Sequence, residues 1–190
     1  MKTKKILVLC ALVLNFSNLS FAADDSIPEN AHRGRNQGGF ELGTLVASPS
    51  KVTFFTLGGK GVRLFQNNLY IGGGGHGGFG VGGGSKSAGI GYGGFIAGYL
   101  YPATEKFQIS PEVLLGGGGM GGIYKNGGGV FGGGSLVILP RVYGMFRLCQ
   151  GVFLGAEAGY LIAPMLSKMS GVTLGLNLSF RSSFVTWLVD

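Results

Sequence analysis

The chain has 190 residues, of which 40 are glycine, 45% are hydrophobic and only 12% are charged, and its formal net charge is +7. An ordinary soluble domain carries about 25% charged residues, so this composition indicates contact with lipid. The basic residues form no stripe along the sequence, which argues against a nucleic-acid-binding surface.

Residues 1–22 have the three zones of a secretory signal peptide: a basic start, an apolar run over residues 6–16, and the small-residue exit Ser20-Phe21-Ala22. A membrane-spanning helix needs about 20 consecutive apolar residues, and polar residues interrupt this run from Asn15 onwards. We therefore predict an exported protein that is cleaved after Ala22.

Removal of this leader leaves 168 residues, enough for one domain. The leader carries three of the fifteen basic residues and none of the eight acidic ones, so the net charge falls to +4. Cys10 leaves with the leader and Cys149 remains alone. The mature chain therefore forms no intrachain disulfide.

Residues 23–36 are polar and lack periodicity, which is typical of a flexible tail. From residue 37 onwards, apolar residues alternate with small or polar ones. The alternation is clearest near the end of the chain, where the apolar positions are Val172, Leu174, Leu176, Leu178 and Phe180. A period of two predicts β-strands.

Eight such segments follow one another, bounded by turn-forming residues, at about 37–47, 51–65, 68–81, 88–101, 106–124, 129–148, 151–162 and 170–182. A strand that crosses a membrane needs about 9 to 11 residues, and most of the segments are at least that long. In lipid every backbone polar group must be paired internally, so strands can cross only as a closed barrel. We predict an all-β, transmembrane, antiparallel up-and-down β-barrel of about eight strands, formed by residues 37–190.

Glycine is the most frequent residue in these segments. It is tolerated in strands where the backbone bends sharply or where backbones approach closely, and a narrow barrel requires both. A disordered glycine tract is the alternative, but aromatic and β-branched residues lie between the glycines and favour a packed sheet. A phosphate-binding loop is not supported, because Gly58-Gly59-Lys60-Gly61 lacks the required spacing.

Charged residues lie on the small-residue face of several segments. Three of them, Glu112, Arg141 and Glu157, belong to three consecutive segments, and comparable positions hold Glu41, Lys60 and Arg181. A charge that faces lipid at the membrane midplane costs about 2 to 4 kcal/mol, and a buried charge needs a partner. We therefore predict an inward-facing polar network with a structural role. A conducting or a catalytic role is the alternative.

The sequence supports no catalytic residue, metal site or cofactor. His32 belongs to the polar tail, and His76 lies within a glycine run, where it lines the lumen or marks the rim. A serine–histidine pair requires a serine within hydrogen-bond reach of a histidine, and no motif selects one from Ser85, Ser87 and Ser110. The histidines, Cys149 and the acidic residues show no metal-ligand spacing.

Aromatic residues near the ends of the segments suggest belts at the two membrane interfaces, with packing in the core as the alternative for any one of them; these residues are Tyr99, Tyr101, Tyr143, Tyr160, Phe184 and Trp187.

Three stretches carry a resemblance to a known group: Asn68-Leu69-Tyr70-Ile71 followed by four glycines, Gly91-Tyr92-Gly93-Gly94 with Gly98-Tyr99, and Leu139-Pro140-Arg141 leading to Phe146-Arg147. Over residues 37–182 the chain resembles uncharacterised glycine-rich outer-membrane β-barrel proteins of Gram-negative bacteria. The resemblance implies the architecture of the smallest barrels, the OmpA and OmpX types. It implies no activity.

The resemblance also implies an outer-membrane location, with outer-membrane lipid and the barrel assembly machinery as partners. Barrels of this kind usually end in an aromatic residue that the assembly machinery recognises, and Trp187 is the candidate here. We expect a structural or surface-interaction barrel with a largely filled lumen. The alternatives are a small pore or ligand-binding barrel, an outer-membrane lipid-modifying enzyme, and a soluble secreted β-protein.

Overall fold

The computed structural model describes residues 35–48, 52–65, 67–82, 85–102, 104, 106–124 and 130–181, all of which belong to the unit Gly34–Asp190. The expected leader, residues 23–34 of the expected tail, and residues 182–190 lie outside the described residues. Among the residues described, no helix is long and apolar enough to cross a membrane.

The described chain consists almost entirely of strands, with one short 3₁₀ helix. In chain order the elements are β1 (Arg35–Ala47), β2 (Val52–Leu64), β3 (Leu69–Gly82), β4 (Ser85–Tyr99), β5 (Tyr101–Pro102), β6 (Phe107–Tyr124), β7 (Val130–Cys149), β8 (Val152–Leu161), η1 (Ser167–Met169) and β9 (Gly171–Arg181).

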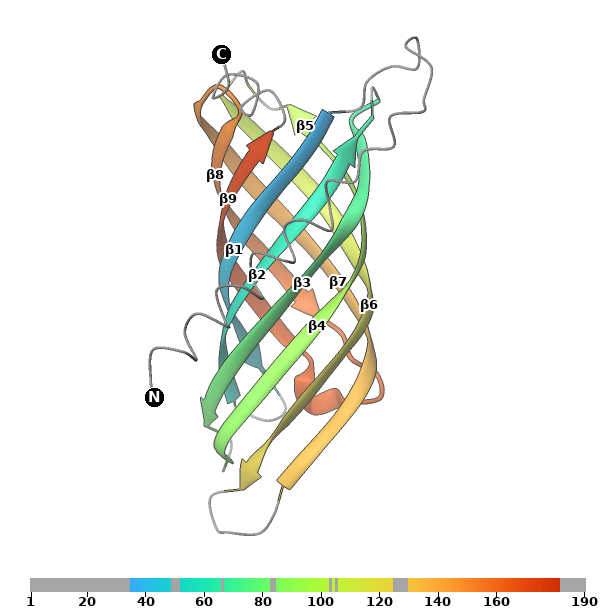
Figure 1. Ribbon diagram of the computed structural model, residues 1–190, viewed down its shortest axis with the longest axis vertical. Coiled ribbons are helices and arrows are strands. Elements are labelled where there is room, and N and C mark those ends of the chain that lie inside the picture. Colours follow the sequence, from blue (N-terminus) through green and yellow to red (C-terminus); the bar gives the residue numbers. More distant parts are fainter. Residues whose placement is uncertain are drawn as a thin grey trace, which may run out of the picture. The chain divides into compact units, whose positions relative to one another are not determined.

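The eight long strands form a closed antiparallel up-and-down β-barrel (Figure 1). Each long strand pairs with the next one in the chain, and β4 pairs directly with β6 because β5 is a two-residue strand beside β6. The sheet closes between β1 and β9, from Gln37 opposite Arg181 to Ala47 opposite Gly171. The predicted fold class is therefore confirmed.

The predicted segments match the eight long strands, and each boundary lies within three residues of the observed one. Two details differ from the expectation. First, β1 begins at Arg35, so the last two residues of the expected tail belong to the barrel. Second, the fourth segment ends at Tyr99, and the short strand β5 follows it as a separate element.

Inward and outward positions alternate along the strands, as β9 shows. Thr173, Asn177 and Ser179 are buried, whereas Leu174 and Leu176 are exposed. Large exposed apolar side chains also cover the outer face of other strands, among them Phe40, Leu42, Phe55, Leu57, Leu136, Val142 and Leu154. Such a surface is unfavourable in water and is typical of the lipid-facing band of a membrane barrel.

Side chains fill the interior, as expected for the narrow lumen of an eight-stranded barrel. The largest fully buried apolar side chains include Phe54, Ile96, Leu114, Leu139, Leu161 and Met169. Buried apolar residues flank a polar layer along individual strands: in β2, Phe54 precedes the buried Lys60 and Val62 follows it. The polar layer therefore lies between apolar ones.

The connection between β8 and β9, residues 162–170, folds onto one end of the barrel. Its start bridges to β7 through Ile138 and Ile162, and the Met165 backbone N–H donates to Ser135 Oγ at 3.1 Å. Met169, at the end of η1, is fully buried, with its methyl group against Gly118 of β6. This connection therefore helps to fill that end of the lumen.

Candidate functional site

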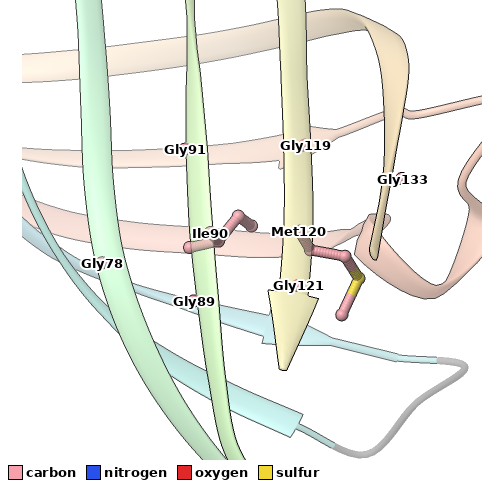
Figure 2. A pocket seen from close by; sticks show the side chains of 8 residues that line it. All are labelled: Gly78, Gly89, Ile90, Gly91, Gly119, Met120, Gly121 and Gly133. Atoms are coloured by element: carbon pink, nitrogen blue, oxygen red, sulfur yellow. The ribbon is translucent and has the colours of Figure 1, made fainter. Parts of the chain in front are cut away.

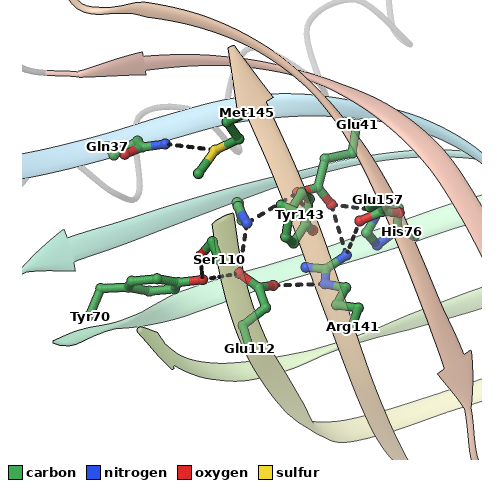
Figure 3. A network of polar contacts seen from close by, with 11 residues as sticks. Gln37, Glu41, Tyr70, His76, Ser110, Glu112, Arg141, Tyr143, Met145 and Glu157 are labelled. Atoms are coloured by element: carbon green, nitrogen blue, oxygen red, sulfur yellow. Dashed lines mark hydrogen bonds and ion pairs between the residues drawn. The ribbon is translucent and has the colours of Figure 1, made fainter. Parts of the chain in front are cut away.

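A group of buried polar side chains meets in the middle of the lumen (Figure 3). We call it the interior polar cluster; its members, from strands β1, β2, β3, β6, β7 and β8, are Glu41, Lys60, Tyr70, His76, Glu112, Arg141, Tyr143 and Glu157. Each member lies on the inward-facing register of its strand, so the alternation of the strands directs all of them to the same space.

Arg141 joins three carboxylates from different strands. Its Nε donates to Glu112 Oε1 at 2.7 Å, and its Nη1 donates to Glu41 Oε2 at 3.0 Å and to Glu157 Oε2 at 3.1 Å. Figure 3 shows the guanidinium between Glu112 on one side and Glu41 and Glu157 on the other. One cation therefore ties together β1, β6, β7 and β8 across the lumen.

Lys60 provides the second cation. Its Nζ donates to Glu112 Oε2 at 2.7 Å, lies 3.7 Å from Glu41 Oε1, and sits 3.5 Å from the centre of the Tyr143 ring. The Tyr70 hydroxyl donates to the same Glu112 oxygen at 2.6 Å. Glu112 therefore has a charged or hydroxyl partner on each of its carboxylate oxygens, as a buried carboxylate requires.

Glu41 is the centre of the other half of the cluster. Its Oε1 accepts a hydrogen bond of 2.8 Å from the Tyr143 hydroxyl, and its Oε2 lies 2.8 Å from His76 Nε2. The His76 ring stacks on Tyr92, with 5.1 Å between the ring centres. His76 thus lies inside the lumen and not at the rim, the two positions that the sequence left open.

Glycines provide the space in which the charged side chains lie. Each charged member of the cluster faces an inward-pointing glycine on a neighbouring strand: Glu41 faces Gly58, Lys60 faces Gly74, Glu112 faces Gly98, Arg141 faces Gly159 and Glu157 faces Gly175. A Cβ atom on Gly159 would lie 2.6 Å from the Arg141 Cβ, closer than real Cβ contacts allow. Glycine on the inner face therefore makes room for a large polar neighbour.

The structure brings together five of the six predicted network residues: Glu41, Lys60, Glu112, Arg141 and Glu157. Arg181 is also buried, but it belongs to a different level of the barrel. Its Nη2 donates to Gln37 at 3.3 Å and to Gln108 at 3.4 Å, and its guanidinium lies over the Phe153 ring. Arg181 pairs with Gln37, four residues along β1 from Glu41, which is about 13 Å at the usual rise of a strand. Arg181 thus faces inward as expected, and these contacts lie at a different level from the interior polar cluster.

Sequence reasoning did not assign Tyr70, Tyr143 and His76 to the network. Tyr143 was expected in an interfacial belt, but it is fully buried and hydrogen bonded to Glu41, so the belt is wrong for this residue. Its position on the same register as Arg141 was the available indication. Tyr99, Tyr101 and Tyr160 are exposed, and Phe184 and Trp187 lie outside the described residues.

Neither a family model nor a curated relative matches this sequence. Solved structures do match the fold. Neisserial surface protein A superimposes with a TM-score of 0.59 at 13% identity, over 78% of this chain and 96% of that one. Ail, the attachment invasion locus protein of Yersinia pestis, gives 0.53 at 13% identity, over 78% and 99% of the two chains. The N-terminal β-barrel domain of Pseudomonas aeruginosa OprF gives 0.53 at 9% identity, over 78% and 97%.

This chain has the fold of the small outer-membrane β-barrels. The architecture of the OmpA and OmpX types, which the sequence resemblance implied, is confirmed.

One part of this outer-membrane-type barrel is lined mainly by glycine. A shallow, open hollow of about 470 Å³ extends over β3, β4, β6 and the start of β7 (Figure 2). Ile90 and Met120 line it together with six glycines, Gly78, Gly89, Gly91, Gly119, Gly121 and Gly133. Gly91 pairs with Gly119, and Gly89 with Gly121, so neighbouring strands lack side chains at the same level.

Three members of the interior polar cluster could bind a metal ion. Glu41, His76 and Glu157 each offer one ligand atom, and these atoms lie within 4.8 Å of one another. Their spacing along the chain gives no indication of this, because the three residues come from β1, β3 and β8. Closure of the barrel brings them together.

Proposed function

We propose that this protein is an outer-membrane barrel with a structural or surface-interaction role, whose lumen is closed by its own side chains. One observation carries the proposal: within the lumen, Arg141 of β7 contacts both Glu112 of the neighbouring strand β6 and Glu41 of β1, a strand that does not pair with β7. Lys60 and Tyr143 occupy the space between them. Side chains that meet in this way leave little room for a solute.

The outer face of the barrel supports a location in the outer membrane. At the centre of β9, the Leu176 side chain is 61% exposed, and large apolar residues occupy the outward positions on both sides of it. Two of the similar structures are named as a surface protein and as an attachment invasion locus protein. Those names support a role at the cell surface and identify no binding partner for this chain.

Export through the leader 1–22, and assembly by the barrel assembly machinery into outer-membrane lipid, are part of the proposal. Membrane fractionation combined with a heat-modifiable gel shift tests it. The folded protein should be recovered with the outer membrane, and the unheated sample should migrate differently from the boiled one, because a closed barrel resists detergent unfolding. Recovery in the aqueous periplasmic fraction, without a shift, would contradict the membrane location.

Conductance in planar bilayers tests the closed lumen. The purified barrel should produce no steady channels, while a large porin inserted in the same bilayers serves as the positive control. Steady conductance by the folded protein would instead favour a small pore.

The proposal includes no enzymatic activity. The hydroxyl of Ser110 lies 2.6 Å from the Tyr70 hydroxyl, and His76 Nε2 lies 2.8 Å from Glu41 Oε2, so each residue contacts a partner that is not part of a serine–histidine pair. Lipid substrates incubated with the wild type and with His76→Asn should show equal turnover, at the level of the empty membrane. Hydrolysis that requires His76 would contradict this part of the proposal.

A further inference from the structure

We propose that Glu41, His76 and Glu157 form a binding site for a divalent first-row transition-metal ion inside the barrel. The ligand atoms of the three residues lie within 4.8 Å of one another, and His76 Nε2 is 2.8 Å from Glu41 Oε2. All three residues are buried. One imidazole nitrogen and two carboxylate oxygens are ligands that zinc accepts, and such a site keeps a fourth position for water.

His76 provides an independent reason to place an ion here. Its side chain is only 2% exposed, and within the described part of the chain Nδ1 has no hydrogen-bond partner. Nε2 has the carboxylate of Glu41 at 2.8 Å, outside ideal hydrogen-bond geometry. A buried imidazole that is only partly satisfied is unfavourable, and a metal ion between the imidazole and the carboxylates would complete its interactions.

The neighbours of His76 hold its ring in this position. Tyr92 stacks on one face of the ring, and Gly58, the residue opposite His76 on β2, leaves the space that the ring occupies. A side chain at Gly58 would meet the ring carbons. The imidazole is therefore oriented before any ion binds, which is a condition for a well-formed metal site.

The charge around these ligands is only partly balanced. Within the described residues, the interior polar cluster contains three carboxylates against Lys60 and Arg141, and Lys60 is bound mainly to Glu112. Glu41 and Glu157 share a single nitrogen of Arg141, whose guanidinium also serves Glu112. Because these two carboxylates share one guanidinium with a third carboxylate, that of Glu112, they still attract a further positive charge.

Arg141 and the metal ion compete for the same two carboxylates. Nη1 of Arg141 lies 3.0 Å from Glu41 and 3.1 Å from Glu157, so an ion that binds both must displace this nitrogen. The other hydrogen bond of the guanidinium, from Nε to Glu112 at 2.7 Å, does not involve these two carboxylates. This competition predicts that loss of the guanidinium tightens metal binding at this site.

The test is a titration with Zn²⁺ of full-length mature protein folded in detergent micelles, followed by calorimetry. The starting protein carries His32→Gln and Cys149→Ser, which remove an imidazole of the expected tail and the exposed thiol of β7. It should bind one equivalent of Zn²⁺. His76→Gln and Glu157→Gln should each weaken binding by about tenfold or more, and Arg141→Gln should strengthen it by a similar factor.

Folding of each variant is checked by the heat-modifiable gel shift, and the rise in unfolding temperature with Zn²⁺ gives a second measurement, because a ligand that binds only the folded state stabilises it. The rise should disappear in His76→Gln and persist in the starting protein. The proposal is wrong if the starting protein binds no Zn²⁺, if binding survives both ligand substitutions, or if Arg141→Gln leaves the affinity unchanged.

Discussion

Glu112 and Arg141 face each other directly in the register of β6 and β7, and Arg141 Nε donates to Glu112 Oε1 at 2.7 Å. The register of neighbouring strands makes this contact and also the one with Glu157 of β8, which lies opposite Tyr143. The contact of the same guanidinium with Glu41 of β1 requires closure of the barrel. Arg141 therefore joins a contact between neighbouring strands, with Glu112, to a contact across the lumen, with Glu41.

Arg141→Ala should lower the free energy of unfolding by about 3 to 5 kcal/mol, because it leaves three buried carboxylates with a single remaining cation. The measurement is denaturant unfolding in lipid vesicles. Arg147→Ala is the matched control, since Arg147 lies on the same strand and is exposed; its effect should stay within about 0.5 kcal/mol. Equal effects of the two substitutions would show that the interior ion pairs contribute nothing.

Gly159→Ala should destabilise the barrel by about 1 to 3 kcal/mol, because its Cβ would lie 2.6 Å from Arg141 Cβ and 2.7 Å from the Pro140 carbonyl oxygen. Gly77→Ala tests glycine content without crowding, since a Cβ at Gly77 meets no atom within 4 Å. Unfolding of both variants in the same vesicles gives the comparison. If Gly77→Ala is as destabilising as Gly159→Ala, backbone conformation rather than space explains the inner glycines.

Tyr143→Phe should destabilise the barrel by about 1.5 to 3 kcal/mol, because it removes the hydrogen bond of 2.8 Å to the buried carboxylate of Glu41. The ring remains, so its contact with Lys60 is kept. Tyr160→Phe, at an outward-facing position of β8, is the control and should change little. A Tyr143→Phe variant as stable as the control would indicate that Glu41 finds another donor.

Leu176→Lys should destabilise the barrel folded in vesicles by about 2 to 4 kcal/mol, because Leu176 is exposed at the centre of β9, where the proposed orientation puts the bilayer midplane. Met165→Lys, in the connection after β8, places the same charge at one end of the barrel and should cost much less. Equal costs would place the β9 surface in water and contradict the transmembrane orientation.

Most of the fold could be predicted from the sequence because a strand alternates its side chains with a period of two. In β9 this pattern identified the outward face, and the same argument placed Glu112, Arg141 and Glu157 inside. The alternation does not show how far along the barrel axis a residue lies. Arg181 was therefore assigned to the inward face, while its level along the barrel, beside Gln37 and Gln108, came from the structure.

The contacts across the lumen could not be predicted, because they depend on the relative register of strands that do not pair directly with each other. His76 and Glu41 come from β3 and β1, with Gly58 of β2 between them. Nothing in the local sequence around His76 distinguishes a side chain stacked on Tyr92 from one at the rim. The same holds for Tyr143, whose aromatic ring is compatible with a membrane interface or with the core.

The sequence by itself determined that the chain forms strands, where each strand begins and ends to within a few residues, and which side chains face inward. These properties follow from local alternation. Only the tertiary structure decided which inward charges meet, that each charged residue of the interior polar cluster lies opposite a glycine, and that an imidazole approaches two carboxylates. The glycine opposite each charge is set by the register of neighbouring strands, and the meeting of Glu41 with Arg141 and Glu157 follows when β1 pairs with β9 and closes the barrel.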